Sequence, residues 1–209
     1  DDLSFSNITD CNANDGTITI SAINGTGNFE YSINGGASWE ANGGFYTDLA
    51  PATYDVRVRN DDGTCEVLYA SPVSLSEPPS PIITNVASTP ISDCNAADGT
   101  ITISASGGIP NGIEYSIDGG ISWQANGGNY SNLAPGTYNV QIRNNDGTCV
   151  ITAPNSISLV DPPAPTIVDV SPSPITDCGA DDGSITILVS DGTGTFEYSI
   201  NGGLSWEAN

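Results

Sequence analysis

The chain has 209 residues, of which 25 are acidic and three basic, so its formal net charge is −22. A surface with so few bases is a poor partner for nucleic acid or anionic lipid, because nothing on it displaces counterions from phosphates. The sequence has no histidine or lysine, which excludes Ser–His, Cys–His and Schiff-base nucleophiles. We therefore expect no catalytic residues and no enzyme activity.

Three segments in the first part of the chain alternate between apolar and polar residues. In Thr17–Ala22, Ile18 and Ile20 share one face, and Phe29–Asn34 and Tyr54–Arg59 alternate in the same way. Such alternation is typical of half-buried β-strands, and no segment has an amphipathic helical pattern. We predict an all-β fold, and about seven short strands in roughly 84 residues favour an immunoglobulin-like β-sandwich.

One block of sequence occurs three times. DCNANDGTITI at Asp10 returns as DCNAADGTITI at Asp93 and as DCGADDGSITI at Asp177, so matched positions lie 83 or 84 residues apart. This period is longer than the roughly 20–50 residues of a solenoid unit and suits a small domain with its own core. The sequence predicts one module used repeatedly.

Proline-rich segments mark the module boundaries. SLSEPPSPIITNV (74–86) and SLVDPPAPTIVDV (158–170) lie at matched places, and proline restricts both its own backbone and the residue before it. We predict immunoglobulin-like repeats at 1–80 and 81–163 and the N-terminal part of a third at 164–209. Stiff linkers would arrange them as a rod, and we interpret the chain as an excerpt of a longer repetitive protein.

The five cysteines recur with the repeat. If each module closes on itself, the disulfides are Cys11–Cys65 and Cys94–Cys149, and the partner of Cys178 lies beyond the chain end. Each bridge would stabilise its module by about 4 kcal/mol. Disulfides persist in oxidising compartments, so we expect an extracellular protein. A zinc–thiolate site is disfavoured because there is no CxxC segment and no histidine.

Recurring acidic residues are the candidate calcium ligands. They are Asp10, Asp62, Glu77, Asp93, Asp146, Asp161 and Asp177. Calcium takes six to eight oxygen ligands, and the linker acids Glu77 and Asp161 could share an ion with the loop that opens the next module. The alternative is ordinary turn chemistry, in which Asp accepts hydrogen bonds from nearby backbone. We favour the turn interpretation, above all for Asp15, Asp98 and Asp182, so no cofactor is required.

Tryptophan recurs in a GGxSWxAN segment, at Trp39, Trp123 and Trp206. An exposed Trp could stack on a sugar ring, which makes these three the candidate glycan-binding residues. A buried Trp would instead anchor a small core, the interpretation that we favour. Arg59 and Arg143 face outward beside outward-facing glutamates, which predicts cross-strand ion pairs of small energy.

Several of these segments together resemble a known family. DGTITISA at Asp15, FEYSINGG at Phe29, DLAPATYDVRVRNDDGTC at 48–65 and NLAPGTYNVQIRNNDGTC at 132–149 are similar to the SprB-type repeat. That repeat occurs in very large cell-surface adhesins of gliding Bacteroidota. The resemblance implies an all-β module, type IX secretion, and a place in long filaments for adhesion or gliding motility. It implies no catalytic motif.

The sequence therefore favours a structural repeat segment of a long extracellular adhesin or surface filament. Its partners would be neighbouring copies of the repeat, with no nucleic acid and no direct membrane insertion. One alternative is an array of carbohydrate-binding modules that uses the tryptophans to bind surface glycans. Another is a polymer subunit whose unfinished third module is completed by strand exchange from a neighbouring chain.

Overall fold

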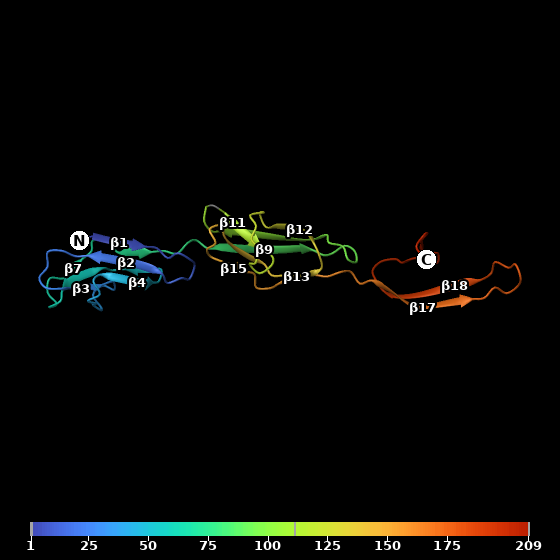
Figure 1. Cartoon of the computed structure of the whole chain (residues 1–209), viewed down its shortest axis with the longest axis horizontal. Helices are drawn as coiled ribbons and strands as arrows, with labels where there is room; N and C mark the ends of the chain where they lie inside the picture. Colours follow the sequence, from blue (N-terminus) through green and yellow to red (C-terminus); the bar gives the residue numbers. More distant parts are fainter. Residues whose placement is uncertain (1, 111, 209) are drawn as a thin grey trace. The chain divides into compact units, whose positions relative to one another are not determined.

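The protein is all-β. The structure, a computed structural model, describes residues 2–110 and 112–208, and all the named elements of this part of the chain are strands (Figure 1). No helix in the described residues is long and apolar enough to cross a bilayer. The predicted fold class is thus confirmed.

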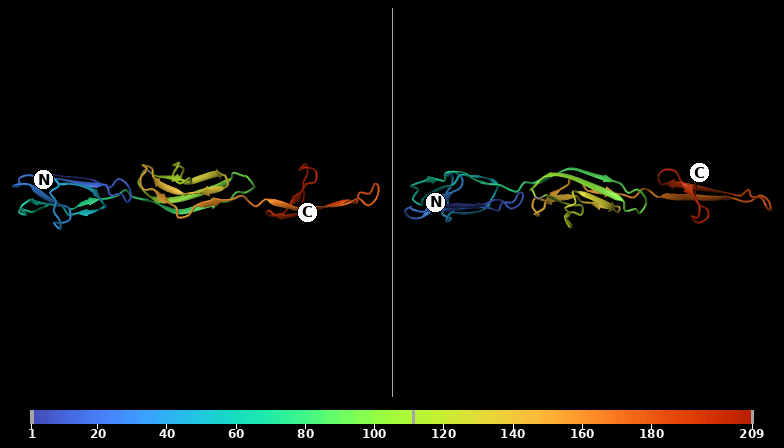
Figure 2. Two further views of the ribbon diagram at one scale, coloured as in Figure 1. Left: turned by 60° about the horizontal axis from the view of Figure 1, so that its bottom comes forward. Right: turned by 90° about the horizontal axis from the view of Figure 1, so that it is seen from above.

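The first eight strands form three small antiparallel sheets. They are β1 (Asp2–Ser6), β2 (Gly16–Ser21), β3 (Phe29–Ser32), β4 (Phe45–Leu49), β5 (Ala52–Tyr54), β6 (Arg57–Asn60), β7 (Val67–Leu68) and β8 (Val73–Leu75). Their sheet orders are β1-β2-β4, β3-β6-β7 and β5-β8, and Figure 2 shows the strands from two further sides.

The next eight strands repeat this pattern. They are β9 (Pro81–Thr89), β10 (Gly99–Gly107), β11 (Ile113–Ser116), β12 (Asn129–Leu133), β13 (Gly136–Tyr138), β14 (Gln141–Asn144), β15 (Ile151–Thr152) and β16 (Ile157–Leu159). The sheets are β12-β10-β9, β11-β14-β15 and β13-β16. Even the register recurs, because Glu30 lies opposite Arg59 and Glu114 lies opposite Arg143.

The last four strands form two hairpin-like pairs. They are β17 (Pro165–Ser173), β18 (Ser184–Asp191), β19 (Glu197–Tyr198) and β20 (Glu207–Ala208). Strand β17 pairs with β18, and β19 pairs with β20. The pairing of β17 with β18 corresponds to that of β9 with β10 in the preceding copy.

The chain divides into two compact units. Unit 1 comprises Asp1–Val86, Ile103–Gly128 and Tyr138–Ser156, and unit 2 comprises Ala87–Thr102, Asn129–Thr137 and Ile157–Asn209. These boundaries do not test the division into modules at 80 and 163. The immunoglobulin-like sandwich, the 84-residue module and the rod stay predictions.

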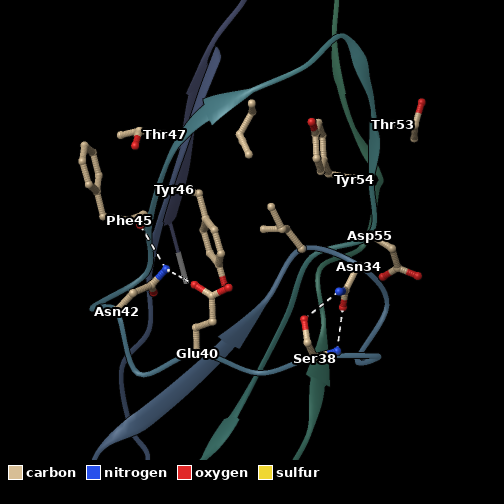
Figure 3. Close-up of a pocket in the computed structure, with 12 residues that line it drawn as sticks. Asn34, Ser38, Glu40, Asn42, Phe45, Tyr46, Thr47, Thr53, Tyr54 and Asp55 are labelled. Atoms are coloured by element: carbon tan, nitrogen blue, oxygen red, sulfur yellow. Dashed lines mark hydrogen bonds between the residues drawn. The ribbon is translucent and has the colours of Figure 1, made fainter. Parts of the chain in front are cut away.

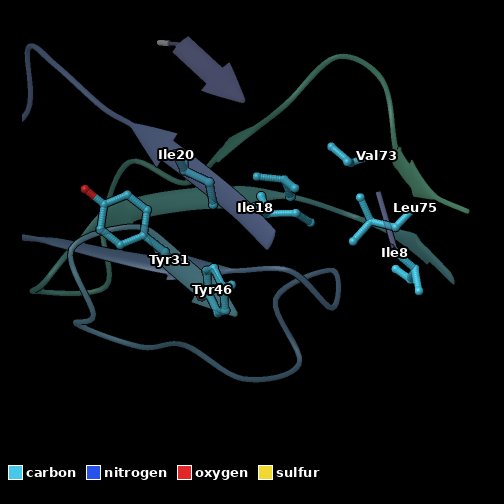
Figure 4. Packing of buried hydrophobic residues seen from close by; sticks show 8 residues of the cluster. Ile8, Ile18, Ile20, Tyr31, Tyr46, Val73 and Leu75 are labelled. Carbon is cyan, nitrogen blue, oxygen red and sulfur yellow. The ribbon is translucent and has the colours of Figure 1, made fainter. Parts of the chain in front are cut away.

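The core of the first copy draws on all three of its sheets. Its buried members are Ile8, Ile18, Ile20, Tyr31, Tyr46, Val56, Val73 and Leu75 (Figure 4). Along β2 the buried residues alternate with half-buried threonines. The period-two pattern thus correctly predicted which face of this strand is buried, because successive side chains of a strand point to opposite faces.

In each of the first two copies, one glycine allows two backbone segments to approach closely. A Cβ on Gly44 would lie 2.2 Å from the carbonyl oxygen of Ile20, and one on Gly128 would lie 2.0 Å from that of Ile103. Both glycines have φ of +79°. The second glycine of the repeated Asn-Gly-Gly segment therefore permits a close approach of two backbone segments that a side chain would block.

Candidate functional site

A disulfide in unit 1 joins the first copy of the repeat to the second. Cys11 and Cys149 are bonded, with their Cα atoms 4.9 Å apart and a separation of 138 positions in the sequence. In the chain-entropy model, closing a loop of that length stabilises the fold by about 5 kcal/mol. We call Asp10, Cys11, Glu77, Pro78 and Cys149 the cysteine joint.

The pairings Cys11–Cys65 and Cys94–Cys149 are wrong. Cys65 and Cys94 are free and exposed, as is Cys178. The reason is that Cys11 precedes the start of β2, whereas the turn of Cys65 lies beside Asn28, beyond the other end of β2. Six extended residues span about 20 Å, far more than the roughly 4.4–6.8 Å between Cα atoms that a disulfide tolerates.

Asp10 holds the two halves of the cysteine joint together. Its Oδ1 accepts hydrogen bonds from the backbone N–H of Cys11 at 2.7 Å and from that of Cys149 at 2.6 Å. The carbonyl oxygen of Pro78 lies 3.4 Å from Sγ of Cys11 and 3.7 Å from Sγ of Cys149. The carboxylate, the linker and both sulfurs therefore meet at one point.

The linker between the first two copies is fixed to the second copy. Asn144 Nδ2 donates to the carbonyl oxygen of Pro79 at 3.2 Å, and the N–H of Gly108 donates to that of Ser80 at 3.2 Å. Pro81 and Asn144 are buried. Since unpaired buried polar groups are costly, these bonds specify how the linker runs.

The acidic candidates bond to nearby backbone and hydroxyl groups. Asp93 and Asp177 accept from the N–H of Cys94 and Cys178, and Asp62 and Asp146 accept from Thr64 and Thr148. These contacts are the turn chemistry that the sequence favours, in which an Asp accepts hydrogen bonds from nearby groups. The turn bonds lower the pKa values of Asp62 and Asp146, the first mainly through the Thr64 hydroxyl and the second mainly through the Thr148 N–H.

The linker acids Glu77 and Asp161 do not bond to the loop that opens the next module. Glu77 Oε2 accepts from the N–H of Asn12 at 2.9 Å, and Asp161 Oδ1 accepts from that of Asn95 at 3.2 Å. Each therefore bonds to the cysteine loop of its own copy, not to that of the next. Among the described residues, the one group of three potential metal ligands is Asp10, Cys11 and Cys149, whose sulfurs are bonded to each other.

A second recurring arrangement surrounds the turn that carries Asp118. Its carboxylate accepts from the hydroxyl of Ser116 at 2.7 Å and from the N–H and hydroxyl of Ser122. These hydrogen bonds, chiefly those of Ser122, lower the pKa of Asp118 to about 2. At the matched position of the first copy, Asn34 accepts from Ser32 and Ser38 in the same way.

Family models match these recurring segments. The SprB repeat matches residues 4–38 and 169–205, which contain two of the cysteine loops and end one residue before Trp39 and Trp206. These two segments are therefore similar to the SprB repeat. The BNR/Asp-box repeat matches residues 114–125, the turn built around Asp118. No curated protein matches the chain.

The three recurring tryptophans lie at the surface, not in the core. Trp39 and Trp123 are half-buried, and the guanidinium carbons of Arg59 and Arg143 lie 4.2 Å from their ring centroids. Trp206 is exposed. The core interpretation is therefore wrong. The arginine covers one face of each of the first two rings, which leaves less of them for a sugar.

The same arginines form the predicted ion pairs. Nη2 of Arg59 lies 2.6 Å from Glu30 Oε2, and Nη2 of Arg143 lies 2.7 Å from Glu114 Oε2. Each arginine thus holds a glutamate and a tryptophan together. A partly exposed ion pair contributes about 0–1 kcal/mol and an exposed cation–π contact about 0.5–1 kcal/mol, so each cluster has a modest local effect.

A polar pocket lies beside the core of the first copy of the repeat (Figure 3). Its volume is about 870 Å³, and its lining includes Glu40, Tyr46, Tyr54 and Asp55. The hydroxyl of Tyr46 has no hydrogen-bond partner among the described residues, although its side chain is only 8% exposed. Burial, together with the charge of Glu40, raises the pKa of Tyr46 to about 12, so the hydroxyl is a proton donor at neutral pH.

Proposed function

We propose that this chain is a structural repeat segment of a long extracellular adhesin or surface filament. The SprB match supports a place in a surface protein. We further propose that it acts without catalysis or a required cofactor, that its partners are neighbouring repeats, and that it reaches the surface by type IX secretion. Its net charge of −22 keeps such repeats soluble and mutually repelling.

The observation that carries this proposal is the Cys11–Cys149 disulfide. It links one repeat to the next instead of closing a single repeat. Tension applied to the two ends of the chain passes from residue 11 to residue 149 through the sulfurs, so residues 12–148 bear no load along the backbone. A covalent bypass of this kind suits a filament under pulling force and adds nothing to a freely diffusing binding module.

Single-molecule force spectroscopy tests this function. The oxidised chain, held at its two ends, should extend only by the segments outside the loop. Reduction should release a further length of roughly 480 Å, because the 138 locked positions add at most about 3.5 Å each.

The Cys11→Ser and Cys149→Ser variants are the matched controls. Each should show the full extension with and without reductant, while Cys65→Ser should behave as the wild type. The same extension of wild-type chain before and after reduction would refute the mechanical role.

A second candidate function is glycan binding, favoured by the polar pocket of Figure 3. The tyrosine hydroxyls, carboxylates and amides of this lining provide the donors and acceptors that sugar hydroxyls need. If glycans bind there, Tyr46→Phe should weaken binding on a glycan array about five- to twentyfold, the effect of losing one hydrogen bond. Trp39→Ala and Trp123→Ala test the stacking alternative, and binding that survives in Tyr46→Phe but not in these variants would place the glycan on the tryptophans.

A further inference from the structure

The cysteine joint places oxygen atoms of one polarity around its disulfide. A carboxylate oxygen of Asp10 lies within 4.8 Å of both sulfurs. The carbonyl oxygen of Pro78 lies 3.4 Å from Sγ of Cys11 and 3.7 Å from Sγ of Cys149. Because both oxygens carry negative charge or partial charge, the sulfurs lie in a region of negative potential.

The basic side chains of the protein do not offset this potential. The chain has three arginines and neither lysine nor histidine, and every arginine is paired with a carboxylate other than Asp10. These ion pairs join Arg57 to Asp55 and Glu66, Arg59 to Glu30, and Arg143 to Glu114. Within the described residues Asp10 forms no ion pair, so its charge acts on the sulfurs undiminished.

The amides of the two cysteines are engaged as well. The N–H of Cys11 and that of Cys149 both donate to Oδ1 of Asp10, at 2.7 and 2.6 Å. Neither is therefore free to donate to a sulfur anion. Thiolates in proteins are stabilised by basic neighbours or by helix N-termini, and the named elements of the described chain are all strands. The joint thus disfavours a thiolate at either cysteine.

The two sulfurs differ in access to a reductant. Cys11 is half-buried, whereas Cys149 is 1% exposed. A low-molecular-weight thiol attacks as its thiolate, and it reaches Sγ of Cys11 more readily. Its bond to Cys11 forms as the bond to Cys149 breaks, so Cys149 leaves as a buried thiolate beside Asp10. A second thiolate then releases Cys11, and the two protein thiols gain two electrons and two protons in all.

We propose that Asp10 protects the Cys11–Cys149 disulfide against reduction by thiols. The charge of Asp10 repels the attacking thiolate and opposes the negative charge that develops on the departing sulfur of Cys149. Both effects slow the exchange. This inference goes beyond the proposed function, because it concerns the chemistry of the bond and not the load that the bond carries. A chain whose tension passes through this disulfide would keep it intact in the presence of thiols.

The variant Asp10→Asn tests the proposal, because the amide oxygen can still accept both N–H bonds while the charge is lost. The oxidised chain is treated with dithiothreitol, and alkylation with mass spectrometry follows the release of Cys11 and Cys149. We expect reduction of Asp10→Asn to be about tenfold faster than that of the wild type, the effect of removing a charge a few ångströms from the sulfurs. The free thiols label at once and serve as the internal reference; they are Cys65, Cys94 and Cys178.

Salt supplies a second measurement, which begins with the unaltered protein. Raising the ionic strength from about 0.01 M to about 1 M shortens the screening length from about 30 Å to about 3 Å. Salt should speed reduction of the wild type more than that of Asp10→Asn, since the variant retains only the repulsion from the rest of the acidic surface. The ratio of the two rates should therefore fall towards one.

Asp93→Asn is the matched control. Asp93 accepts from the N–H of Cys94 as Asp10 accepts from that of Cys11, but its loop holds a free cysteine, so this variant should be reduced at the wild-type rate. Equal rates for the wild type and Asp10→Asn, or a ratio that salt does not change, would overturn the inference. The force measurement compares the chain before and after complete reduction, so its result does not depend on how fast the bond is reduced.

Discussion

Asp118 shows how one side chain specifies a recurring turn of this chain. It accepts from Ser116 and Ser122, while Asn34 and Asn201 hold the matched turns with their amide oxygens. The amide also donates from its nitrogen to Ser38 or Ser205. Carboxylate and amide thus satisfy the same backbone groups, but only the carboxylate titrates.

The second turn should therefore be the acid-sensitive one. Because the pKa of Asp118 falls to about 2 on folding, its stabilisation is present above the unfolded value near 4 and is lost as pH falls through about 2. Asp118→Asn should remove this part of the acid dependence and leave the fold unchanged at pH 7. NMR titration of the carboxyl carbon checks the pKa, and Asn34→Asp should create a second depressed carboxylate. A normal pKa at Asp118 would contradict the assignment.

Local chemistry at the residue scale could be predicted from the sequence. The alternation in β2, the Glu30–Arg59 pair and the turn role of Asp15 depend on neighbours in one strand or turn. The positions of the tryptophans could not be predicted. Whether Trp39 faces the core depends on the sheet that lies over it, and the nearby Arg59 was the signal that its ring lies beside a charged face.

At the scale of elements, β2, β10 and β18 have nearly identical sequences and very different surroundings. Ile101 in β10 is fully buried, whereas Ile185 in β18 is half exposed. The strand forms in either setting because its β-branched residues favour an extended backbone. Burial, and with it the energy gained from each apolar side chain, is supplied by the sheets that pack against it.

This contrast predicts a large difference between two matched substitutions. Ile101→Ala should destabilise its repeat by about 2–5 kcal/mol, the usual cost of truncating a buried isoleucine. Ile185→Ala should cost less than about 1 kcal/mol, because much of its side chain is already in water. Urea unfolding followed by tryptophan fluorescence measures both. Similar losses at the two positions would mean that Ile185 is covered in solution.

At the scale of the whole molecule, the disulfide pairing is what sequence reasoning got wrong. Assuming that each repeat closes on itself selected Cys11–Cys65, but the two cysteines lie at opposite ends of the repeat. The sequence signal against this pairing was β2 itself. This strand of six residues separates the cysteine loop from the turn of Asn28, beside which Cys65 lies. The loop of Cys11 in the first repeat meets the turn of Cys149 in the second, whereas the loop of Cys11 and the turn of Cys65 within the first repeat lie apart.

The predicted rod is a property of the whole chain, and small-angle scattering tests it. We expect an elongated particle, because mutual repulsion at a net charge of −22 and the bonded linker both oppose folding back. Cys11→Ser should broaden the distance distribution, since one covalent restraint at the joint is lost. A compact particle from the oxidised chain would refute the rod.

The Cys11–Cys149 bond also changes what a protease can do to this chain. Every peptide bond from residue 11 to residue 149 lies inside the covalent loop, including those of the proline-rich linker. A single cut there leaves both products attached through the sulfurs, so one nick cannot sever the chain. After such a nick, the two ends of the chain separate only through a cut outside the loop or through a reductant. A surface protein built from such joints would therefore tolerate a nick inside a loop without shedding its outer end.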